Sequence, residues 1–298
     1  MRVLHLDSGP TLQGGQIQVI RLVEGLERLR VNQVVLARGE LQRKVGAGPF
    51  NLATVFAQAG KADVIHAHDA QSHTWAVLLG RGRPLVVSRR VAFPVKGGIL
   101  SRLKYAQADR YLAVSEAVKK KLRESGVPEH RITVVSDGID PPTEEPVWTP
   151  PEATPRVAIL DSADPLKRTA AAVEACRLAG LEPVVDHNLE RALDLADFFL
   201  YVPQIEGFGS AILAAAIRKT PVVAAAVGGI PEVIVDAETG LLTDGSVEQA
   251  AHALRRLADD PDLARGIADR AYNLVSSCFS SDIMVDRTAE VYRSLLAS

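Results

Sequence analysis

The residue types best suited to binding chemistry gather between positions 202 and 242. Glu206 opens the run Glu-Gly-Phe-Gly, which follows an apolar stretch typical of a buried strand and precedes an apolar helix. A second expected strand, at 221–224, leads into Gly228-Gly229 and another expected helix start. Glycines let a ligand approach the backbone, and a helix start offers unpaired N–H groups to anions. This segment therefore predicts a ligand site at the carboxyl ends of parallel strands. Taken by itself, Glu206 is better explained as a cap of the following helix, because the helix dipole stabilises a carboxylate there.

Residues suited to holding a phosphate group occur at two further places. Lys167 and Arg168 follow another expected strand, where a lysine is often only a solvated surface charge but can also pair with a phosphate. Gly14 and Gly15 end the loop after the first expected strand, so that Gln16 would start the following helix. A glycine pair is weak evidence by itself, but between a strand and a long helix it can cradle a phosphate or an acceptor.

Two histidines, His66 and His68, lie at the end of the expected strand at 64–67, and His73 follows. Residues two apart on a strand share a face, so a metal site is one interpretation. We favour a packed or hydrogen-bonded histidine pair, because the spacing matches no known zinc pattern. Asp260-Pro261-Asp262 is an aspartate-x-aspartate run, but it is better explained as a helix cap. We therefore predict no catalytic metal.

The region from 81 to 121 is rich in Lys and Arg. Arg89, Arg90 and Lys96 are interleaved with apolar residues such as Phe93 and Ile99. A solvated charged face is the simpler interpretation. The mixture of cations and apolar side chains also suits an anionic membrane surface or an anionic, lipid-linked acceptor.

These candidates need a scaffold, and the pattern of the chain predicts one. Expected strands at 3–6, 33–36, 64–67, 85–87, 111–114 and 133–135 alternate with helices, for example at 16–28 and 116–124. Repeated strand–helix–strand units imply a parallel sheet with helices on both faces. Residues 141–155 are proline-rich and are predicted to form a linker, because proline removes hydrogen-bond donors and fixes φ. We therefore predict domains at 1–140 and 156–279 and a final helix at 280–298.

Composition limits the function classes. The chain has 298 residues and a formal net charge of −2, which is typical of a globular protein and argues against nucleic-acid binding. No apolar run reaches membrane-spanning length, and we expect no signal peptide. Cys176 and Cys278 are far apart without metal-ligand spacing, so we expect a reduced, cytoplasmic chain.

The motifs taken together resemble the GT-B glycosyltransferases of family 4, also called group 1. The resemblance rests on ordered elements: Glu206-Gly207-Phe208-Gly209, Pro221-Val222-Val223-Ala224, Gly228-Gly229, Glu232 and Thr239-Gly240-Leu241-Leu242. The chain departs from the family pattern at three positions. Ala214 stands where the resembled family has a second Glu, which accepts hydrogen bonds from the ribose hydroxyls of the donor, and Asp161 and Ser162 stand where a Gly-Arg pair is expected.

The resemblance implies an α/β fold of the GT-B type, with two Rossmann-like parallel-sheet domains facing an interdomain cleft and a final helix that packs back on the first domain. It implies a retaining transfer of a sugar from a nucleotide-diphosphate sugar to a hydroxyl of a saccharide or lipid-linked acceptor, in cell-envelope lipopolysaccharide or polysaccharide assembly. No cofactor beyond the donor is expected. The alternative is a catalytically weak or inactive protein that binds sugar nucleotides, which the loss at Ala214 favours. A sugar-nucleotide epimerase of the same fold is a third reading.

The resemblance also implies roles for single residues. Glu206 and His68 are the expected catalytic residues, both facing the donor sugar. Arg89, Arg90 and Lys96 are expected to serve the acceptor or an anionic membrane, with peripheral attachment at the inner face of the cytoplasmic membrane. The donor-binding residues are expected to be Gly14, Gly15, Lys167, Arg168, Gly207, Phe208, Gly209 and Ser210.

Overall fold

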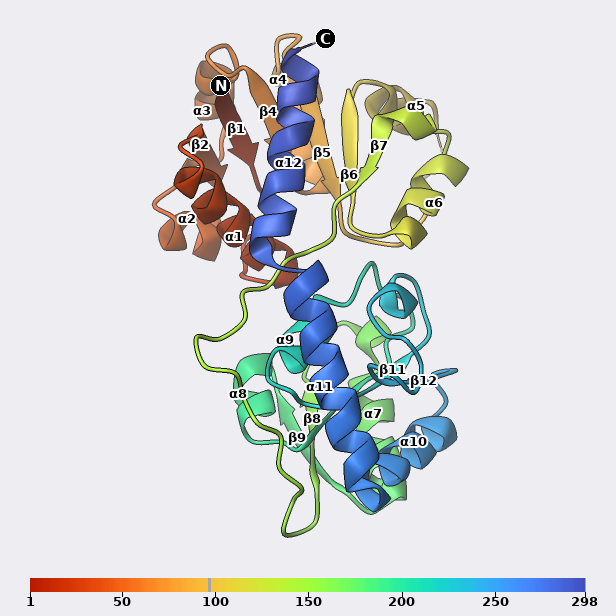
Figure 1. The fold of residues 1–298 in the computed structure, drawn as a ribbon. Coiled ribbons are helices and arrows are strands. Elements are labelled where there is room, and N and C mark those ends of the chain that lie inside the picture. The colour runs from red at the N-terminus through yellow and green to blue at the C-terminus, as the bar shows by residue number, and fades with distance from the viewer. Residues whose placement is uncertain (96–97, 298) are drawn as a thin grey trace. The chain divides into compact units, whose positions relative to one another are not determined.

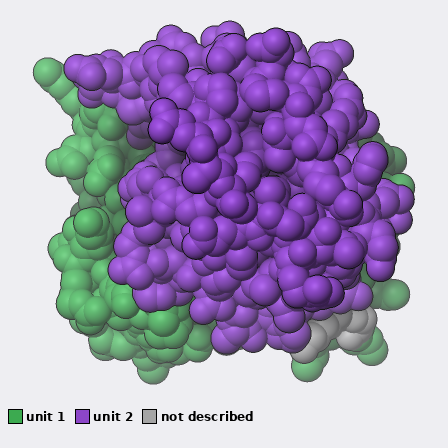
Figure 2. All heavy atoms as spheres, turned by 90° about the horizontal axis from the view of Figure 1, so that it is seen from below, with its two compact units in different colours: residues 1–138, 281–298 green, residues 139–280 purple. Residues whose placement is uncertain are grey.

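The computed structural model describes residues 1–95 and 98–297, so that Lys96 lies outside the described residues. The chain divides into two compact units, which Figure 2 distinguishes by colour. Unit 1 comprises Met1–Gly138 and Ser281–Ser298, and unit 2 comprises Ile139–Ser280. Each contains one parallel sheet, so the predicted α/β fold with two parallel sheets is confirmed.

Unit 1 is built on a seven-stranded sheet of order β3-β2-β1-β4-β5-β6-β7 (Figure 1). Its strands are β1 (Arg2–Leu6), β2 (Asn32–Ala37), β3 (Gly48–Pro49), β4 (Val64–Ala67), β5 (Leu85–Arg89), β6 (Arg110–Ala113) and β7 (Ile132–Val134). Its helices are α1 (Gly14–Arg28), α2 (Gly39–Lys44), α3 (Leu52–Ala59), α4 (Ala70–Leu79), α5 (Ile99–Ala106), α6 (Glu116–Glu124) and α12 (Ser281–Leu296), with a 3₁₀ turn η1 at Glu129–Arg131.

The last helix, α12, completes the core of unit 1. Its residues Met284, Val285, Ala289 and Tyr292 are buried in one cluster with residues of the sheet and of α1. A Cβ added at Gly25 of α1 would lie 2.3 Å from Val285, so the two helices approach closely because this position has no side chain. The helix that is last in sequence is therefore part of the first fold unit.

Unit 2 contains a five-stranded sheet of order β12-β11-β10-β8-β9. Its strands are β8 (Arg156–Leu160), β9 (Glu182–Asp186), β10 (Phe198–Tyr201), β11 (Val222–Ala225) and β12 (Leu241–Thr243). Its helices are α7 (Thr169–Ala179), α8 (Leu189–Asp194), α9 (Ser210–Ala216), α10 (Val247–Asp259) and α11 (Pro261–Cys278), with 3₁₀ turns η2 (Pro165–Lys167) and η3 (Ile230–Glu232). Strand β10, the middle strand, is buried along its whole length, as expected of a parallel sheet covered on both faces.

The proline-rich segment at 141–155 forms no helix or strand and belongs to unit 2. Trp148, in its middle, is 9% exposed and stacks on Phe198 with ring centroids 6.2 Å apart. The indole Nε1 donates a hydrogen bond to the Asp197 carbonyl at 3.1 Å. One aromatic side chain with a satisfied N–H therefore fastens this segment to the core of unit 2.

Two expected local structures differ from those observed. Gly14 and Gly15 do not end a loop; they are the first two residues of α1, and Gln13 precedes it as the N-cap. The Gly228-Gly229 turn does not lead into an α-helix but into the three-residue turn η3. Pro231 inside η3 fixes its own φ and donates no hydrogen bond, which suits a tight turn but does not by itself extend a helix.

Candidate functional site

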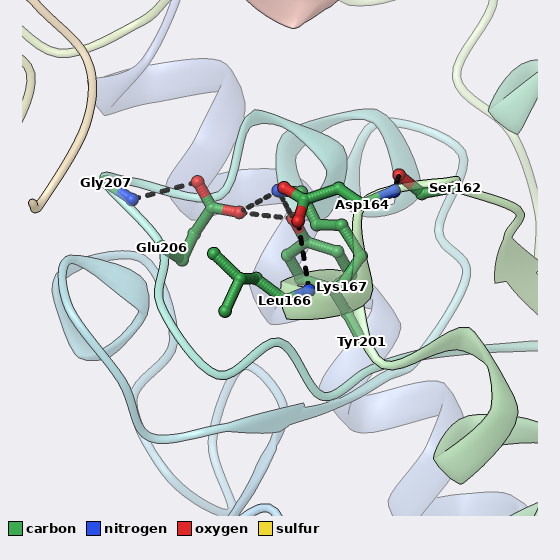
Figure 3. A network of polar contacts seen from close by, with 7 residues as sticks. All are labelled: Ser162, Asp164, Leu166, Lys167, Tyr201, Glu206 and Gly207. Atoms are coloured by element: carbon green, nitrogen blue, oxygen red, sulfur yellow. Dashed lines mark hydrogen bonds and ion pairs between the residues drawn. The ribbon is translucent and has the colours of Figure 1, made fainter.

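The carboxyl end of the unit 2 sheet brings Lys167 and Glu206 together (Figure 3). Lys167 closes η2 after β8, and Glu206 follows β10, which is the neighbour of β8 in the sheet. A backbone hydrogen bond of 2.8 Å from Gln204 N to Leu166 O ties the two loops to each other. The Lys167 Nζ then lies 2.7 Å from Glu206 Oε2, and both side chains are mostly buried. A parallel sheet thus places a cation beside a carboxylate 39 residues away in sequence.

The Glu-Gly-Phe-Gly turn is held in place by two close contacts. Gly228 has φ +56°, and a Cβ there would lie 1.7 Å from the Glu206 carbonyl oxygen, so only glycine fits this contact between the two glycine turns. Phe208 is 2% exposed and meets Phe279 edge to face. The turn therefore has little freedom to move the carboxylate of Glu206.

The predicted donor-binding backbone lies at this turn. The N–H of Gly207 donates to Glu206 Oε1 at 2.9 Å, so this group orients the carboxylate. Gly209 adopts φ +99° and is the N-cap of α9, which begins at Ser210. The ring of Phe208 is buried in the core, so any role of this residue in binding a donor would fall to its backbone.

Tyr201 is a functional candidate that sequence reasoning missed. It is the last residue of β10, and its hydroxyl accepts a hydrogen bond from Lys167 Nζ at 2.7 Å and also contacts Glu206 Oε2 (Figure 3). Burial, and then the negative charge of Glu206, raise the pKa of Tyr201 well above its usual 10, so the hydroxyl stays protonated. The feature of the sequence that could have revealed it is a tyrosine at the end of an otherwise apolar strand.

Arg168 is placed differently from Lys167. Its backbone is left-handed, with φ +56°, at the junction between η2 and α7. Its Nη1 donates to the Gly245 carbonyl at 2.7 Å, which fastens the start of α7 to the loop before α10. The guanidinium therefore has a structural partner in the described structure, whereas Lys167 is directed at Glu206.

The structure also shows where residues that depart from the family pattern lie. Ala214 is half-buried on α9, and its carbonyl accepts a bond from Arg218 Nη1 at 3.2 Å. Ser162 accepts from the Asp164 N–H at 3.2 Å, and Asp164 in turn accepts from Leu166 N, so these polar groups shape the loop that carries Lys167 (Figure 3).

In unit 1, the sheet register adds a third histidine to the predicted pair. His5 on β1 is the direct partner of His66 on β4, and the His5 Nδ1 lies 3.0 Å from His68 Nε2. His66 is bonded on both nitrogens, to the Tyr292 hydroxyl at 2.6 Å and the Ser88 hydroxyl at 2.8 Å. His5 was not predicted, because the pairing of β1 with β4 cannot be read from the sequence.

This cluster favours hydrogen bonding over a metal. One ring nitrogen from each of His5, His66 and His68 lies within 4.8 Å of the other two, which fits a three-histidine site in distance. Both nitrogens of His66 are already engaged, and the positive charge of Arg90 acts on His66 and His68. Burial lowers the pKa of His5 to about 4 and those of His66 and His68 well below 6.5. These contacts therefore support the interpretation of the three histidines as a neutral, hydrogen-bonded group.

His68 differs from His66 in having one nitrogen left over. Its Nδ1 is buried and has no hydrogen-bond partner within the described part of the chain. His73, the other nearby histidine, packs edge to face against Tyr105 and Tyr111, and burial lowers its pKa to about 3. In the described structure, His68 and His73 each keep one buried ring nitrogen without a hydrogen-bond partner, and His68 is the one that directly follows β4.

The other predicted residues of unit 1 that the structure describes lie at the same end of the sheet. Gly14 is exposed and Gly15 half-buried at the start of α1, and a Cβ on Gly15 would lie 3.9 Å from Arg90. Arg90 Nε donates to Asp137 at 3.1 Å, while its Nη1 is buried and finds no acceptor in the described structure. Arg89 donates to the Tyr105 hydroxyl and to the Phe93 carbonyl. Both guanidinium groups are therefore held by the protein.

Comparison with known proteins agrees with the motifs. Residues 12–142 match the model of Glycosyltransferase Family 4, and residues 165–274 match that of Glycosyl transferases group 1. A D-inositol 3-phosphate glycosyltransferase of Streptomyces avermitilis is 38% identical over 109 residues, which cover 34% of this chain and 23% of the relative. An alpha-maltose-1-phosphate synthase of Mycolicibacterium smegmatis is 35% identical over 125 residues, covering 39% and 32%. The chain thus matches only about a quarter to a third of these relatives' length.

Solved structures share the fold along the whole chain. The Anabaena protein Alr3699/HepE, determined in complex with UDP-glucose, superposes with a TM-score of 0.82 at 18% identity and covers 99% of this chain and 100% of its own. A glycosyltransferase from Rickettsia africae gives a TM-score of 0.76, again at 18% identity, with 99% of each chain covered. With both family models matched in order, the chain belongs to the GT-B glycosyltransferases of family 4, or group 1.

Proposed function

We propose that this protein is a glycosyltransferase that moves a sugar from a nucleotide-diphosphate sugar to an acceptor hydroxyl. The observation that carries the proposal is the pairing of Lys167 with Glu206 beside two glycine turns at the carboxyl end of the unit 2 sheet. Ligands of open α/β sheets bind at this end. The membership of the family and the UDP-glucose bound to the Anabaena protein support the same donor class.

The chemistry follows from the charges. When the sugar leaves the donor, negative charge grows on the departing diphosphate, and a fixed cation stabilises that charge. Lys167 supplies the cation in unit 2, and we propose that transfer therefore needs no metal ion or other cofactor. Glu206 is held by Gly207 N–H and is suited to accept hydrogen bonds from sugar hydroxyls. We further propose retention of the anomeric configuration, as the family resemblance implies.

For the acceptor we propose a hydroxyl of a saccharide or a lipid-linked saccharide in cell-envelope polysaccharide or lipopolysaccharide assembly. The unpartnered nitrogens of His68 and Arg90 in unit 1 support a polar acceptor, because each offers a hydrogen-bonding group that the protein leaves unused. Arg90 Nη1 suits an acceptor that carries a negative charge. The names of two relatives, D-inositol 3-phosphate glycosyltransferase and alpha-maltose-1-phosphate synthase, point to phosphorylated compounds in those proteins.

We also propose peripheral attachment to an anionic membrane through α5, at the inner face of the cytoplasmic membrane. None of the described helices is long and apolar enough to cross a bilayer. Helix α5 exposes Ile99 at 79%, Leu100 at 83% and Leu103 at 55%, beside the exposed cation Arg102. Apolar residues next to cations are typical of a segment that lies at a membrane surface. The proposal rests on α5, since Arg89 and Arg90 have partners inside the protein.

The donor proposal is tested by titrating the protein with UDP-glucose in a calorimeter. Lys167→Met should weaken binding at least tenfold, because a charge-assisted contact to phosphate is lost. Arg177→Gln removes one positive charge from a highly exposed side chain of the same unit and should leave binding unchanged. Glu206→Gln should keep most of the binding but strongly reduce turnover, measured as UDP release, without abolishing it. Equal binding by Lys167→Met and wild type would refute the proposed donor site.

One observation favours the alternative of a binding protein with little or no transferase activity. Ala214 cannot supply the carboxylate that the family pattern places there. Saturable binding of UDP-glucose together with no UDP release above the spontaneous rate, across a panel of saccharide acceptors, would select this alternative.

A further inference from the structure

The hydroxyl of Tyr201 joins the two charged groups of the candidate donor site. Tyr201 is 5% exposed, and its ring stacks on that of Phe199 with centroids 5.7 Å apart. The hydroxyl lies 2.7 Å from Lys167 Nζ and also contacts Glu206 Oε2, and these three groups close a triangle (Figure 3). Stacking alone would require only a phenyl ring at this position, so the hydroxyl calls for its own explanation.

The direction of each hydrogen bond in the triangle is fixed by chemistry. An ammonium group only donates, and an ionised carboxylate only accepts. The tyrosine hydroxyl has one proton and two lone pairs, so it accepts from Lys167 and donates its proton to Glu206. The raised pKa of Tyr201 agrees, because a protonated hydroxyl is what this arrangement requires.

The three donors divide unequally between the two oxygens of Glu206. Oε1 receives the Gly207 N–H at 2.9 Å, while Oε2 receives both Lys167 and Tyr201. If the ammonium of Lys167 turns toward a phosphate oxygen, Oε2 loses that partner. Tyr201 then remains the side-chain donor of the triangle that still holds Glu206 in its orientation.

We propose that Tyr201 is a positioning residue that keeps Glu206 aimed at the donor sugar while Lys167 is engaged by the donor diphosphate. This inference rests on the proposed function and names a residue that the family pattern does not single out. The hydroxyl acts through Glu206 and not on the nucleotide, so its loss affects turnover more than binding.

The test is Tyr201→Phe, which removes the hydroxyl and keeps the ring. With UDP-glucose as donor and UDP release as the readout, we expect kcat to fall about tenfold or more, as for the loss of a hydrogen bond to a charged group. The KM for UDP-glucose and the Kd for UDP should change less than about twofold. Lys167→Met should give the opposite pattern, with Kd affected most.

Tyr272→Phe is the matched control. Tyr272 lies in the same unit with Lys219 5.3 Å above its ring, and no hydrogen bond joins its hydroxyl to another described residue. This variant should keep wild-type kcat. Thermal unfolding of both variants shows whether either change merely destabilises unit 2.

A double-variant cycle identifies the group through which Tyr201 acts. In a Glu206→Gln background, Tyr201→Phe should have little further effect on kcat, whereas in a Lys167→Met background the loss should persist. An unchanged kcat in Tyr201→Phe, or an effect confined to the Kd for UDP, overturns the inference while leaving the donor site intact. A wild-type protein that binds neither UDP nor UDP-glucose overturns both this inference and the proposed function.

Discussion

Acidification should unfold unit 1 before unit 2, because unit 1 buries four neutral histidines. His5, His66, His68 and His73 are each at most 7% exposed, and burial is the largest cause of the lowered pKa of each. The folded unit therefore resists protonation, while the unfolded chain binds protons once the pH falls below the ordinary value of 6.5. Stability is full above 6.5 and decreases as the pH falls below it.

The free energy of unfolding that unit 1 loses at about pH 5 is set by the protons that its histidines bind in the unfolded chain. The folded pKa is about 4 for His5 and about 3 for His73, so both stay mostly neutral in the folded unit at that pH. Each histidine then costs about 1.5 pH units times 1.36 kcal/mol, or roughly 2 kcal/mol. His5 and His73 together lose roughly 4 kcal/mol, which is a large part of the whole stability of a typical domain, and the lowered pKa values of His66 and His68 act in the same direction.

The two tryptophans of the chain allow this to be measured unit by unit. Trp75 lies in unit 1 against Phe50, and Trp148 lies in unit 2. Urea unfolding of Trp148→Phe reports unit 1, and unfolding of Trp75→Phe reports unit 2. The free energy of unfolding of unit 1 should be far lower at about pH 5 than at about pH 7.5, and that of unit 2 should change much less.

Single variants then show which histidines cause the pH-dependent loss of stability. In the Trp148→Phe background, His5→Gln should shrink the pH-dependent loss of unit 1 by roughly 2 kcal/mol, because one proton-binding group of the unfolded chain is gone. His252→Gln, at an exposed position on α10, is the matched control and should leave the loss unchanged. Equal stability of unit 1 at both pH values, or the same loss with and without His5, would refute the reasoning.

Four further predictions follow from the sites. In thermal unfolding, Gly228→Ala should destabilise unit 2 by more than Gly180→Ala does. Both glycines have positive φ, so each substitution costs backbone strain of about 1 kcal/mol or more. A Cβ at Gly180 meets open space, whereas one at Gly228 would lie 1.7 Å from a carbonyl oxygen, so the loss of stability at Gly228 should exceed the strain alone. Ala214→Glu should tighten UDP binding by about fivefold per restored ribose hydrogen bond, and weaker calorimetric binding by a folded variant would show that the ribose is held elsewhere. Leu100→Glu should reduce pelleting with anionic vesicles, while Leu78→Glu, at a similarly exposed position on α4, should not; equal pelleting of wild type and both variants would contradict the α5 proposal. Turnover should persist in EDTA, and a complete loss that Mg²⁺ or Mn²⁺ restores would show that a metal takes part.

Local sequence patterns predicted most of the strands, and they placed the candidate residues at the carboxyl ends of those strands. The strand expected at 64–67 matches β4, and the helix expected at 116–124 matches α6, because apolar runs bounded by glycine, proline and capping residues carry this information locally. The very short β3 was missed, since two residues cannot show a periodicity.

The contacts within the site depend on which strands become neighbours, and the sequence does not state this. The approach of Lys167 to Glu206 needs β8 beside β10, and that of His5 to His66 needs β1 beside β4. The N-cap position of Gln13, which brings Gly14 into the helix, is also an unusual choice that capping preferences disfavour. Tyr201 went unnoticed because an aromatic residue in a strand is ordinary until its hydroxyl is seen to have partners.

The place of α12 in the chain sets an order of events during synthesis on the ribosome. Unit 2 is continuous in sequence, whereas unit 1 needs the segment at 281–297 that is made after unit 2. Until that segment leaves the exit tunnel, the pocket for Tyr292 stays empty and His66 Nδ1 lacks the partner shown here. Residues 1–138 are therefore synthesised well before the helix that completes their core, and during that time they expose an apolar surface that chaperones can bind.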